Sequence, residues 1–342
     1  MLLEIIIFLS LGFVGLFYGA KFVVVSLENI AQRYNVSHLM VGLTILAIGT
    51  SLPEIAISVI GGLDKVTGID PQIDGIIIGN KVGSFFTQIT LILGILGVSQ
   101  RIFISKWKLR REGLMLFLSV LIFTILSLDG TLNGSDGWIL ICSYSIYLGF
   151  IIWSEKKLEK KQAEIKEFIA KRDGLELESE EKAKESNEPN PKLGRNIIIF
   201  IIGLSILLFS AELTIISAHK ISIVFNIPEN VVGVLIVGFG TSLPELIADM
   251  MALKRESGGI AVGDILGSNV CDILLASGSG SVIANFNIPP IILMFDIPIL
   301  FAAIGLIIYF LNTDNTLKCW ESVVIIGFYG FYAFLKIFFF QM

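Results

Sequence analysis

Apolar runs long enough to cross a lipid bilayer recur from one end of the chain to the other. A membrane-spanning helix needs about 20 predominantly apolar residues. Ten segments approach or exceed this length: 2–30, 39–63, 75–99, 113–128, 138–153, 196–226, 231–253, 259–286, 288–311 and 321–340. Only 16% of the residues are charged, against about 25% in a typical soluble protein. The sequence therefore predicts an all-α polytopic membrane protein with ten transmembrane helices.

The second and third predicted helices occur twice. A shift of 191 residues aligns "YNVSHLMVGLTILAIGTSLPEI" (34–55) with "FNIPENVVGVLIVGFGTSLPEL" (225–246), and a shift of 184 aligns "IGNKVGSFFTQITLILG" (78–94) with "VGDILGSNVCDILLASG" (262–278). Each half contains five predicted spans, and an odd number places the two copies in opposite orientations. We therefore expect two inverted five-helix repeats, an architecture typical of secondary transporters.

A charged stretch separates the two repeats, which we assign to residues 1–153 and 196–342. Residues 154–195 are rich in Lys and Glu and contain no apolar run of membrane length, so we expect a solvated, partly helical linker. The short loops on one side of the membrane contain nine basic residues, five of them in 100–112, and those on the other side contain two. The positive-inside rule then predicts a cytoplasmic linker and two extracellular termini in a cell-membrane protein.

Polar residues four apart interrupt the second and third helices of each half. Residues at this spacing share one face of a helix, so each helix presents a hydroxyl one turn from a carboxylate or an amide. A carboxylate near the middle of a span is by default a functional hypothesis, and two glutamates in matching positions strengthen it. The four pairs are Thr50 with Glu54, Ser84 with Gln88, Thr241 with Glu245, and Ser268 with Asp272.

Proline follows each threonine of the repeated "GTSLPE". Pro53 and Pro244 donate no backbone hydrogen bond, which predicts free carbonyls at Gly49 and Gly240 and a kinked or broken helix. Unpaired backbone at membrane depth is tolerated where it lines a cavity or meets a bound ion. Carboxylates, hydroxyls and carbonyls form an all-oxygen set, which suits Ca²⁺ or Na⁺ and does not suit zinc or copper.

Two copies of "GTSLPE", each followed by a "GxxxGS" helix, resemble the calcium/cation antiporter superfamily, most closely its prokaryotic sodium/calcium exchangers. The resemblance covers nearly all of the chain outside the linker. It implies that the four motif helices pack as a central diamond and that the first and sixth helices slide across it. It also implies that Glu54 and Glu245 bind Ca²⁺ and that the carbonyls of Thr50 and Thr241 complete that site.

The same resemblance implies flanking sodium sites. Their oxygens would come from Ser51, Ser84, Ser242, Ser268 and the carbonyls of Ala47 and Gly238, with Gln88 and Asp272 in the family's amide and acid positions. Ca²⁺ and Na⁺ would be transported ions, and we expect no resident cofactor, no enzymatic activity and no nucleic-acid partner. The expected surroundings are a lipid bilayer, and the expected state is a monomer.

Two positions depart from the family pattern. Phe85 and Gln88 occupy positions where the first-half helix usually carries asparagines. Lys81 stands where the second half has Ile265. A lysine one turn before Ser84 either pairs with an acid or extends to the membrane surface, and an inward position would alter the usual ion stoichiometry.

Charge counting favours Na⁺/Ca²⁺ antiport. Two buried carboxylates need a partner to remain ionised, and one Ca²⁺ or several Na⁺ compete for the same oxygens. With two charges already present, a third carboxylate at Asp272 is expected to be neutral. Three alternatives stay open from the residues alone: a proton/calcium exchanger of the same fold, a passive channel, and an intramembrane aspartyl protease that uses Asp264 with Asp272 or Asp249.

Overall fold

The computed structural model describes residues 2–33, 47–69, 73–173, 193–254 and 258–340. Nearly all of these residues are helical, and they form ten helical segments at the ten predicted positions. The first half contains α1 (Leu2–Arg33), α3 (Ala47–Gly49) with α4 (Leu52–Thr67), α5 (Asp74–Phe86) with η2 (Thr87–Ile92) and α6 (Leu93–Ser99), α7 (Lys106–Leu126), and α8 (Gly134–Asp173).

The second half repeats this order. It contains α10 (Leu193–Phe225), then α11 (Glu229–Val232), η3 (Gly233–Val237), α12 (Gly238–Thr241) and α13 (Leu243–Lys254) as one broken segment, then α14 (Gly258–Cys271), η4 (Asp272–Ala276) and α15 (Ser277–Ile283), then η5 (Ile292–Asp296) with α16 (Ile297–Asp314), and finally α17 (Cys319–Phe340). The segments written η are π-helical turns within longer helices.

Eight of the described segments are long and apolar enough to cross a membrane. The second segment falls outside that group because α4 has 16 residues and the chain before α3, residues 34–46, is not described. The fourth falls outside it because α7 begins with the charged sequence "KWKLRRE". The chain is an all-α polytopic membrane protein, as predicted.

Two short strand pairs show that the halves are inverted. β1 (Ile102–Phe103), which follows α6, pairs with β4 (Thr316–Leu317), and β2 (Thr131–Leu132), which follows α7, pairs with β3 (Phe286–Asn287). Helix α7 runs from β1 to β2, so the two pairs lie at opposite ends of the helices. The repeat relates β1 to β3 and β2 to β4, so equivalent loops lie on opposite sides of the molecule. The ten segments therefore form two inverted repeats of five.

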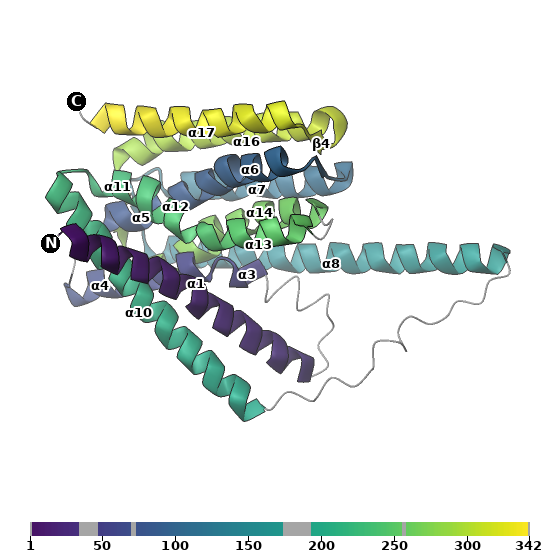
Figure 1. Cartoon of the computed structure of the whole chain (residues 1–342), viewed down its shortest axis with the longest axis horizontal. Helices are drawn as coiled ribbons and strands as arrows, with labels where there is room; N and C mark the ends of the chain where they lie inside the picture. Colours follow the sequence, from purple (N-terminus) through teal and green to yellow (C-terminus); the bar gives the residue numbers. More distant parts are fainter. Residues whose placement is uncertain (1, 34–46, 70–72, 174–192, 255–257, 341–342) are drawn as a thin grey trace.

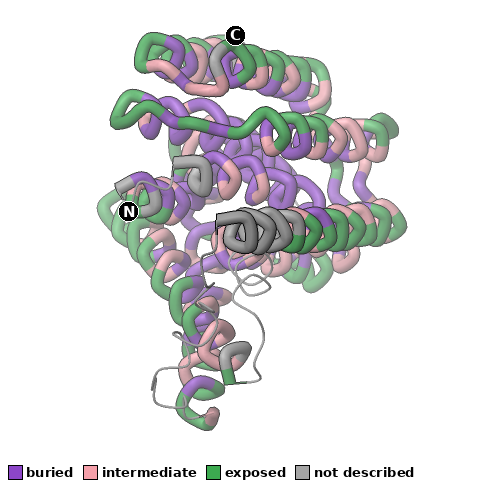
Figure 2. Tube along the Cα trace, turned by 90° about the vertical axis from the view of Figure 1, so that its right-hand side faces the viewer, coloured by how far each residue is buried: buried purple, intermediate pink, exposed green. Residues whose placement is uncertain are grey.

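The helices are arranged in layers (Figure 1). Helices α1 and α10 pack against each other and cross the rest of the bundle obliquely, while α16 and α17 lie on the far side. The buried residues gather between these outer pairs (Figure 2). The outer helices expose large apolar side chains such as Ile6, Phe209 and Phe331, which lipid would cover.

Glycines bring the central helices into backbone contact. Gly79 and Gly83 of α5 face the backbone of η3, where a Cβ on Gly83 would lie 2.1 Å from the carbonyl oxygen of Val234. A Cβ on Gly238 would lie 2.6 Å from the backbone nitrogen of Ser84. Small residues allow this approach between membrane helices, and it brings the third segment of one half against the second segment of the other.

Helix α8 is longer than the predicted fifth span. It continues to Asp173, and Figure 1 shows it extending beyond the other helices. The sequence "EKKLEKKQAEIKEF" consists mainly of good helix formers with opposite charges at helical spacing, which stabilises a solvated helix. The first part of the predicted linker is therefore helical, and residues 174–192 lie outside the described residues.

Candidate functional site

Both proline-containing helices are broken at the motif, as the sequence predicts. Thr50 and Ser51 form a turn between α3 and α4, and Ser242 forms the equivalent turn between α12 and α13. The carbonyl of Gly240 accepts a backbone N–H at the C-terminal cap of α12. The expectation of a free carbonyl at Gly240 is therefore wrong, because the turn supplies a replacement donor.

Two π-helical turns hold the polar residues of the third segments. Gln88 lies in η2, and Asp272 begins η4 at the equivalent place in the other half. A π-turn inserts one residue into an α-helix and is frequent at functional sites. The inserted residue changes which side chains face the centre of the molecule. The four-residue spacing assumes a regular α-helix and therefore did not predict the π-turns.

Hydroxyl groups of one half contact backbone carbonyls of the other. Ser51 Oγ lies 3.4 Å from the carbonyl oxygen of Ser268, and Ser242 Oγ lies 3.5 Å from that of Ser84. Ser51 and Ser242 are repeat partners, and so are Ser268 and Ser84. The two contacts are therefore related by the inverted repeat, which makes the centre of the molecule a junction of both halves.

A second hydrogen-bonded group joins Gln88 to the other half. Gln88 Nε2 donates to Asp272 Oδ2 at 3.0 Å, and Ser268 Oγ donates to Gln88 Oε1 at 3.0 Å. Ser84 Oγ lies 3.5 Å from the same Asp272 oxygen. The longer glutamine therefore reaches across the helix interface to Asp272. The other amide position carries Phe85, which is fully buried in the core.

Glu54 and Glu245 have no hydrogen-bond partners in the described residues. Their side chains are 0% and 1% exposed, and all four carboxylate oxygens lack a partner. Glu245 is close enough to Glu54 and Asp272 for their charges to interact. Thr50 Oγ1 and Asp272 Oδ1 are also buried without a partner in this part of the chain. Buried polar groups are normally hydrogen-bonded, so this group of oxygens needs an explanation.

The remaining predicted ligands are Thr241, Gly238 and Ala47. Thr241 Oγ1 donates to Asn80 Oδ1 at 3.1 Å and also neighbours Glu54. The carbonyl of Gly238 accepts from Ser242 Oγ at 2.8 Å. Ala47 is the first residue of α3, at the edge of the described chain.

Lys81 points inward. Its side chain is 0% exposed, and its Nζ donates to the backbone carbonyl of Glu54 at 2.5 Å. The alternative in which this lysine extends to the membrane surface is therefore wrong. A helix that packs on all sides leaves no route to the surface, and every described residue of α5 is buried.

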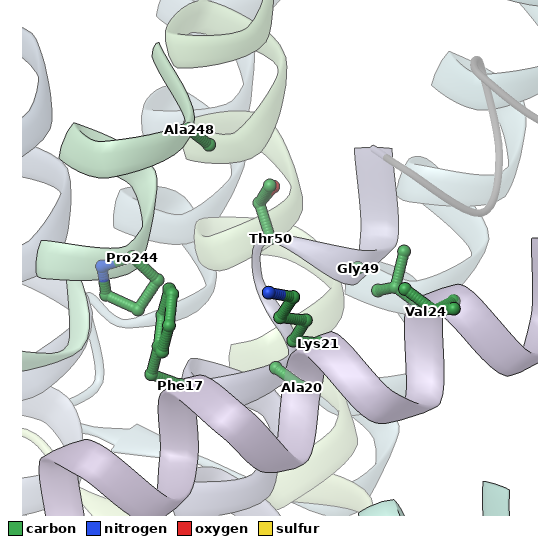
Figure 3. A pocket seen from close by; sticks show the side chains of 9 residues that line it. Phe17, Ala20, Lys21, Val24, Gly49, Thr50, Pro244 and Ala248 are labelled. Carbon is green, nitrogen blue, oxygen red and sulfur yellow. The ribbon is translucent and has the colours of Figure 1, made fainter. Parts of the chain in front are cut away.

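A cleft lies between α1 and the two motif breaks (Figure 3). Helix α1 lines it with Phe17, Lys21 and Val24, and Thr50 and Pro244 lie on the opposite wall. The outer helix therefore covers the breaks of both halves.

Comparison with known proteins identifies the fold. The family model described as "Sodium/calcium exchanger protein" matches residues 4–153 and 195–338, which is most of the chain. The chain belongs to the sodium/calcium exchanger protein family. It is similar to an uncharacterized membrane protein of Methanocaldococcus jannaschii, with 31% identity over 93% of each chain. It is also similar to the sodium/calcium exchanger MaX1 of Methanosarcina acetivorans, with 28% identity over 97% of each chain.

A solved structure supports the same assignment. The sodium-calcium exchanger NCX_Mj, soaked with Na⁺ and Sr²⁺, matches with a TM-score of 0.59 and 29% identity, over 96% of this chain and 97% of that one. Relatives whose names state an activity, such as MaX1 and NCX_Mj, are named as exchangers. Asp249 and Asp264 do lie on different helices, α13 and α14, and are close enough for their charges to interact. They are nevertheless an acidic pair inside an exchanger fold, so the protease alternative loses its support.

Two charged residues in the outer helices occupy equivalent positions of the two repeats. Lys21 of α1 and Glu212 of α10 are related by the same 191-residue shift as the motifs. Glu212 interacts with Asp64 of α4, and Lys21 lines the cleft of Figure 3. Applying the repeat shift to the first helices, where no motif is evident, would have identified this pair.

Proposed function

We propose that this family member is a secondary active antiporter that exchanges Na⁺ for Ca²⁺ by alternating access, with Ca²⁺ bound between Glu54 and Glu245. One observation carries the proposal: four carboxylate oxygens are buried together and have no hydrogen-bond partner in the described residues. Isolated buried carboxylates are strongly unfavourable. A divalent cation that prefers oxygen ligands satisfies both groups at once.

The carbonyls of Thr50 and Thr241 would complete the calcium site. Both threonines precede a helix break, where backbone geometry departs from that of a regular helix. Such breaks near the middle of the membrane are typical ion sites in transporters built from inverted repeats.

Sodium would bind where hydroxyl and carbonyl oxygens lie together. Ser242 Oγ and the carbonyl of Gly238, 2.8 Å apart, form one such pair. Ser51 and the Ala47 carbonyl are its counterparts in the other half, and Ser84 and Ser268 face the two hydroxyls across the repeat. Gln88 and Asp272 would contribute oxygens between these positions.

Exchange follows from the charge of the empty site. Without ions, two or more carboxylates would remain buried in a low dielectric, which opposes the change between access states. Ca²⁺ and Na⁺ remove that obstacle, and they compete for the same oxygens. Each change between access states therefore requires bound Ca²⁺ or bound Na⁺. The sodium gradient would then drive Ca²⁺ in the opposite direction.

Helices α1 and α10 are suited to move as one unit. A Cβ on Gly19 would lie 2.7 Å from the backbone nitrogen of Leu207, and one on Gly203 would lie 3.0 Å from that of Val23. This close backbone contact holds the two helices together. Helix α1 forms one wall of the cleft beside both motif breaks. Sliding of α1 and α10 together would therefore open and close access to Thr50.

We propose that the protein is a monomer in the cell membrane and that its two repeats span residues 1–153 and 196–342. The linker 154–195 would be cytoplasmic and both termini extracellular. The strand pairs support part of this arrangement, because the basic loop 100–112 lies on the same side as β4 and away from β2 and β3.

The test is Ca²⁺ uptake by proteoliposomes that contain the purified full chain. Vesicles loaded with Na⁺ and diluted into Na⁺-free medium should take up Ca²⁺, and vesicles loaded with K⁺ should not. A proton uncoupler should leave the uptake unchanged. Uptake that needs a pH gradient and stops with the uncoupler would instead support the proton/calcium exchanger, and absence of uptake under either gradient would refute exchange.

A further inference from the structure

Lys81 is a buried lysine inside the candidate transport site. It lies in α5, the first part of the third segment, and is completely buried, and its repeat partner in α14 is the apolar Ile265. The two halves therefore differ by one positive charge at equivalent positions. An ionisable side chain inside a membrane protein normally pairs with other polar groups and has a function.

The ammonium group binds a backbone oxygen and leaves the acidic ligands free. Its Nζ donates to the carbonyl of Glu54 at 2.5 Å, while both carboxylate oxygens of Glu54 lack a partner in the described residues. Glu54 and Asp272 are the two carboxylates whose charges act on Lys81. Lys81 therefore contributes positive charge to the site without occupying the oxygens that an ion would need.

Asp272 is arranged as an acceptor. Its Oδ2 receives the Gln88 amide at 3.0 Å and lies 3.5 Å from the Ser84 hydroxyl. Hydrogen bonds from neutral donors to a carboxylate favour its ionised form. The expectation of a neutral Asp272 counted two glutamates and no cation, and the inward Lys81 offsets one of those two negative charges.

The number of transported ions follows from the charges of four side chains. Glu54, Glu245 and Asp272 contribute three negative charges, and Lys81 contributes one positive charge. We propose that Lys81 is a built-in cation that takes the place of one transported Na⁺, so that one Ca²⁺ exchanges for two Na⁺ and no net charge crosses the membrane. This inference rests on the proposed Na⁺/Ca²⁺ exchange and specifies its stoichiometry.

The experiment measures the Ca²⁺ distribution at equilibrium in proteoliposomes with a fixed Na⁺ gradient and a potential set by K⁺ and valinomycin. For two Na⁺ per Ca²⁺, a Na⁺ gradient of about tenfold supports a Ca²⁺ gradient of about 100-fold at every potential. With a third Na⁺, that gradient would be about 1,000-fold at zero potential and would change about tenfold for each ~60 mV.

Variants test whether Lys81 is the cause. Lys81→Met should need a third Na⁺ and should make the equilibrium depend on potential. Lys81→Arg should remain independent of potential, because the charge is retained. The double variant Lys81→Met with Asp272→Asn removes one charge of each sign and should also be independent of potential. Ile265→Met at the repeat-related position is the matched control and should behave as the wild type does.

The outcomes separate this inference from the function on which it rests. Sodium-driven uptake whose equilibrium depends on potential in the wild type would overturn the role of Lys81 and leave exchange intact. A potential-independent Lys81→Met would overturn it as well. Absence of any sodium-driven uptake in the wild type would refute the exchange itself. If Lys81→Met does not fold, the wild type and Lys81→Arg still decide, because both are predicted to be independent of potential.

Discussion

Replacing Gly83 by alanine is predicted to separate two helices at the centre of the molecule. The added Cβ would lie 2.1 Å from the carbonyl oxygen of Val234, 2.6 Å from its Cα and 2.7 Å from its carbonyl carbon. Ordinary contact begins at 3.4 Å. All three obstructing atoms belong to the backbone, so no rotation of a side chain relieves the overlap.

The expected loss of stability is large. Overpacking a well-packed interior costs about 1–3 kcal/mol and occasionally more. Because whole helices must move apart here, we expect about 3 kcal/mol, a considerable part of the ~5–15 kcal/mol that stabilises a typical protein. The displacement also moves Ser84, whose carbonyl oxygen lies 3.5 Å from Ser242 Oγ, so calcium binding should weaken as well.

The assay is thermal unfolding of the purified protein in detergent, followed by tryptophan fluorescence, with Gly305→Ala as the control. Gly305 lies in α16, and a Cβ there would meet nothing within 4 Å. Alanine also favours a helix by about 1 kcal/mol relative to glycine. Gly305→Ala should unfold at the wild-type temperature or above it, and Gly83→Ala several degrees below it. Equal unfolding temperatures for Gly83→Ala and the wild type would refute the close crossing.

Two further predictions concern the buried ion pair of α17 and the orientation of the chain. Lys336 Nζ lies 2.5 Å from Asp296 Oδ2, and both side chains are fully buried, so Lys336→Met should destabilise the protein by about 3–5 kcal/mol. Replacing Asp296 by leucine in addition should recover much of that loss, and a double variant as unstable as the single one would contradict this account. Cysteine labelling from outside, in a cysteine-free background, should reach residues near 132 and not those near 175. Labelling of position 175 in intact cells would show that the orientation is reversed.

The sequence predicted those features that depend on local chemistry or on repetition. The ten segments were predicted from the length of the apolar runs. The helix breaks were predicted from Pro53 and Pro244, because a proline lacks the backbone N–H that a regular helix needs at that position. The inverted repeat follows from two aligned motif pairs and an odd number of spans per half. The strand pairs and the family assignment confirm this architecture.

Other features depend on contacts between distant segments. The π-turns at Gln88 and Asp272 insert a residue where two helices meet, and no local pattern marks that insertion. The direction of Lys81 depends on which neighbours surround α5, because the same side chain on an outer helix would extend to the membrane surface. The roles of individual residues as ion ligands remain predictions.

Ca²⁺ uptake by Glu54→Gln and Glu245→Gln variants tests whether these two glutamates bind the transported Ca²⁺. Each change removes one charge from the site and keeps the side chain's shape. Asp129→Asn, in an exposed loop, is the control for loss of a carboxylate elsewhere. We predict that sodium-driven uptake is abolished in both glutamate variants and retained in the control, with all three proteins folded. Near-normal exchange by a folded Glu54→Gln or Glu245→Gln protein would contradict the account.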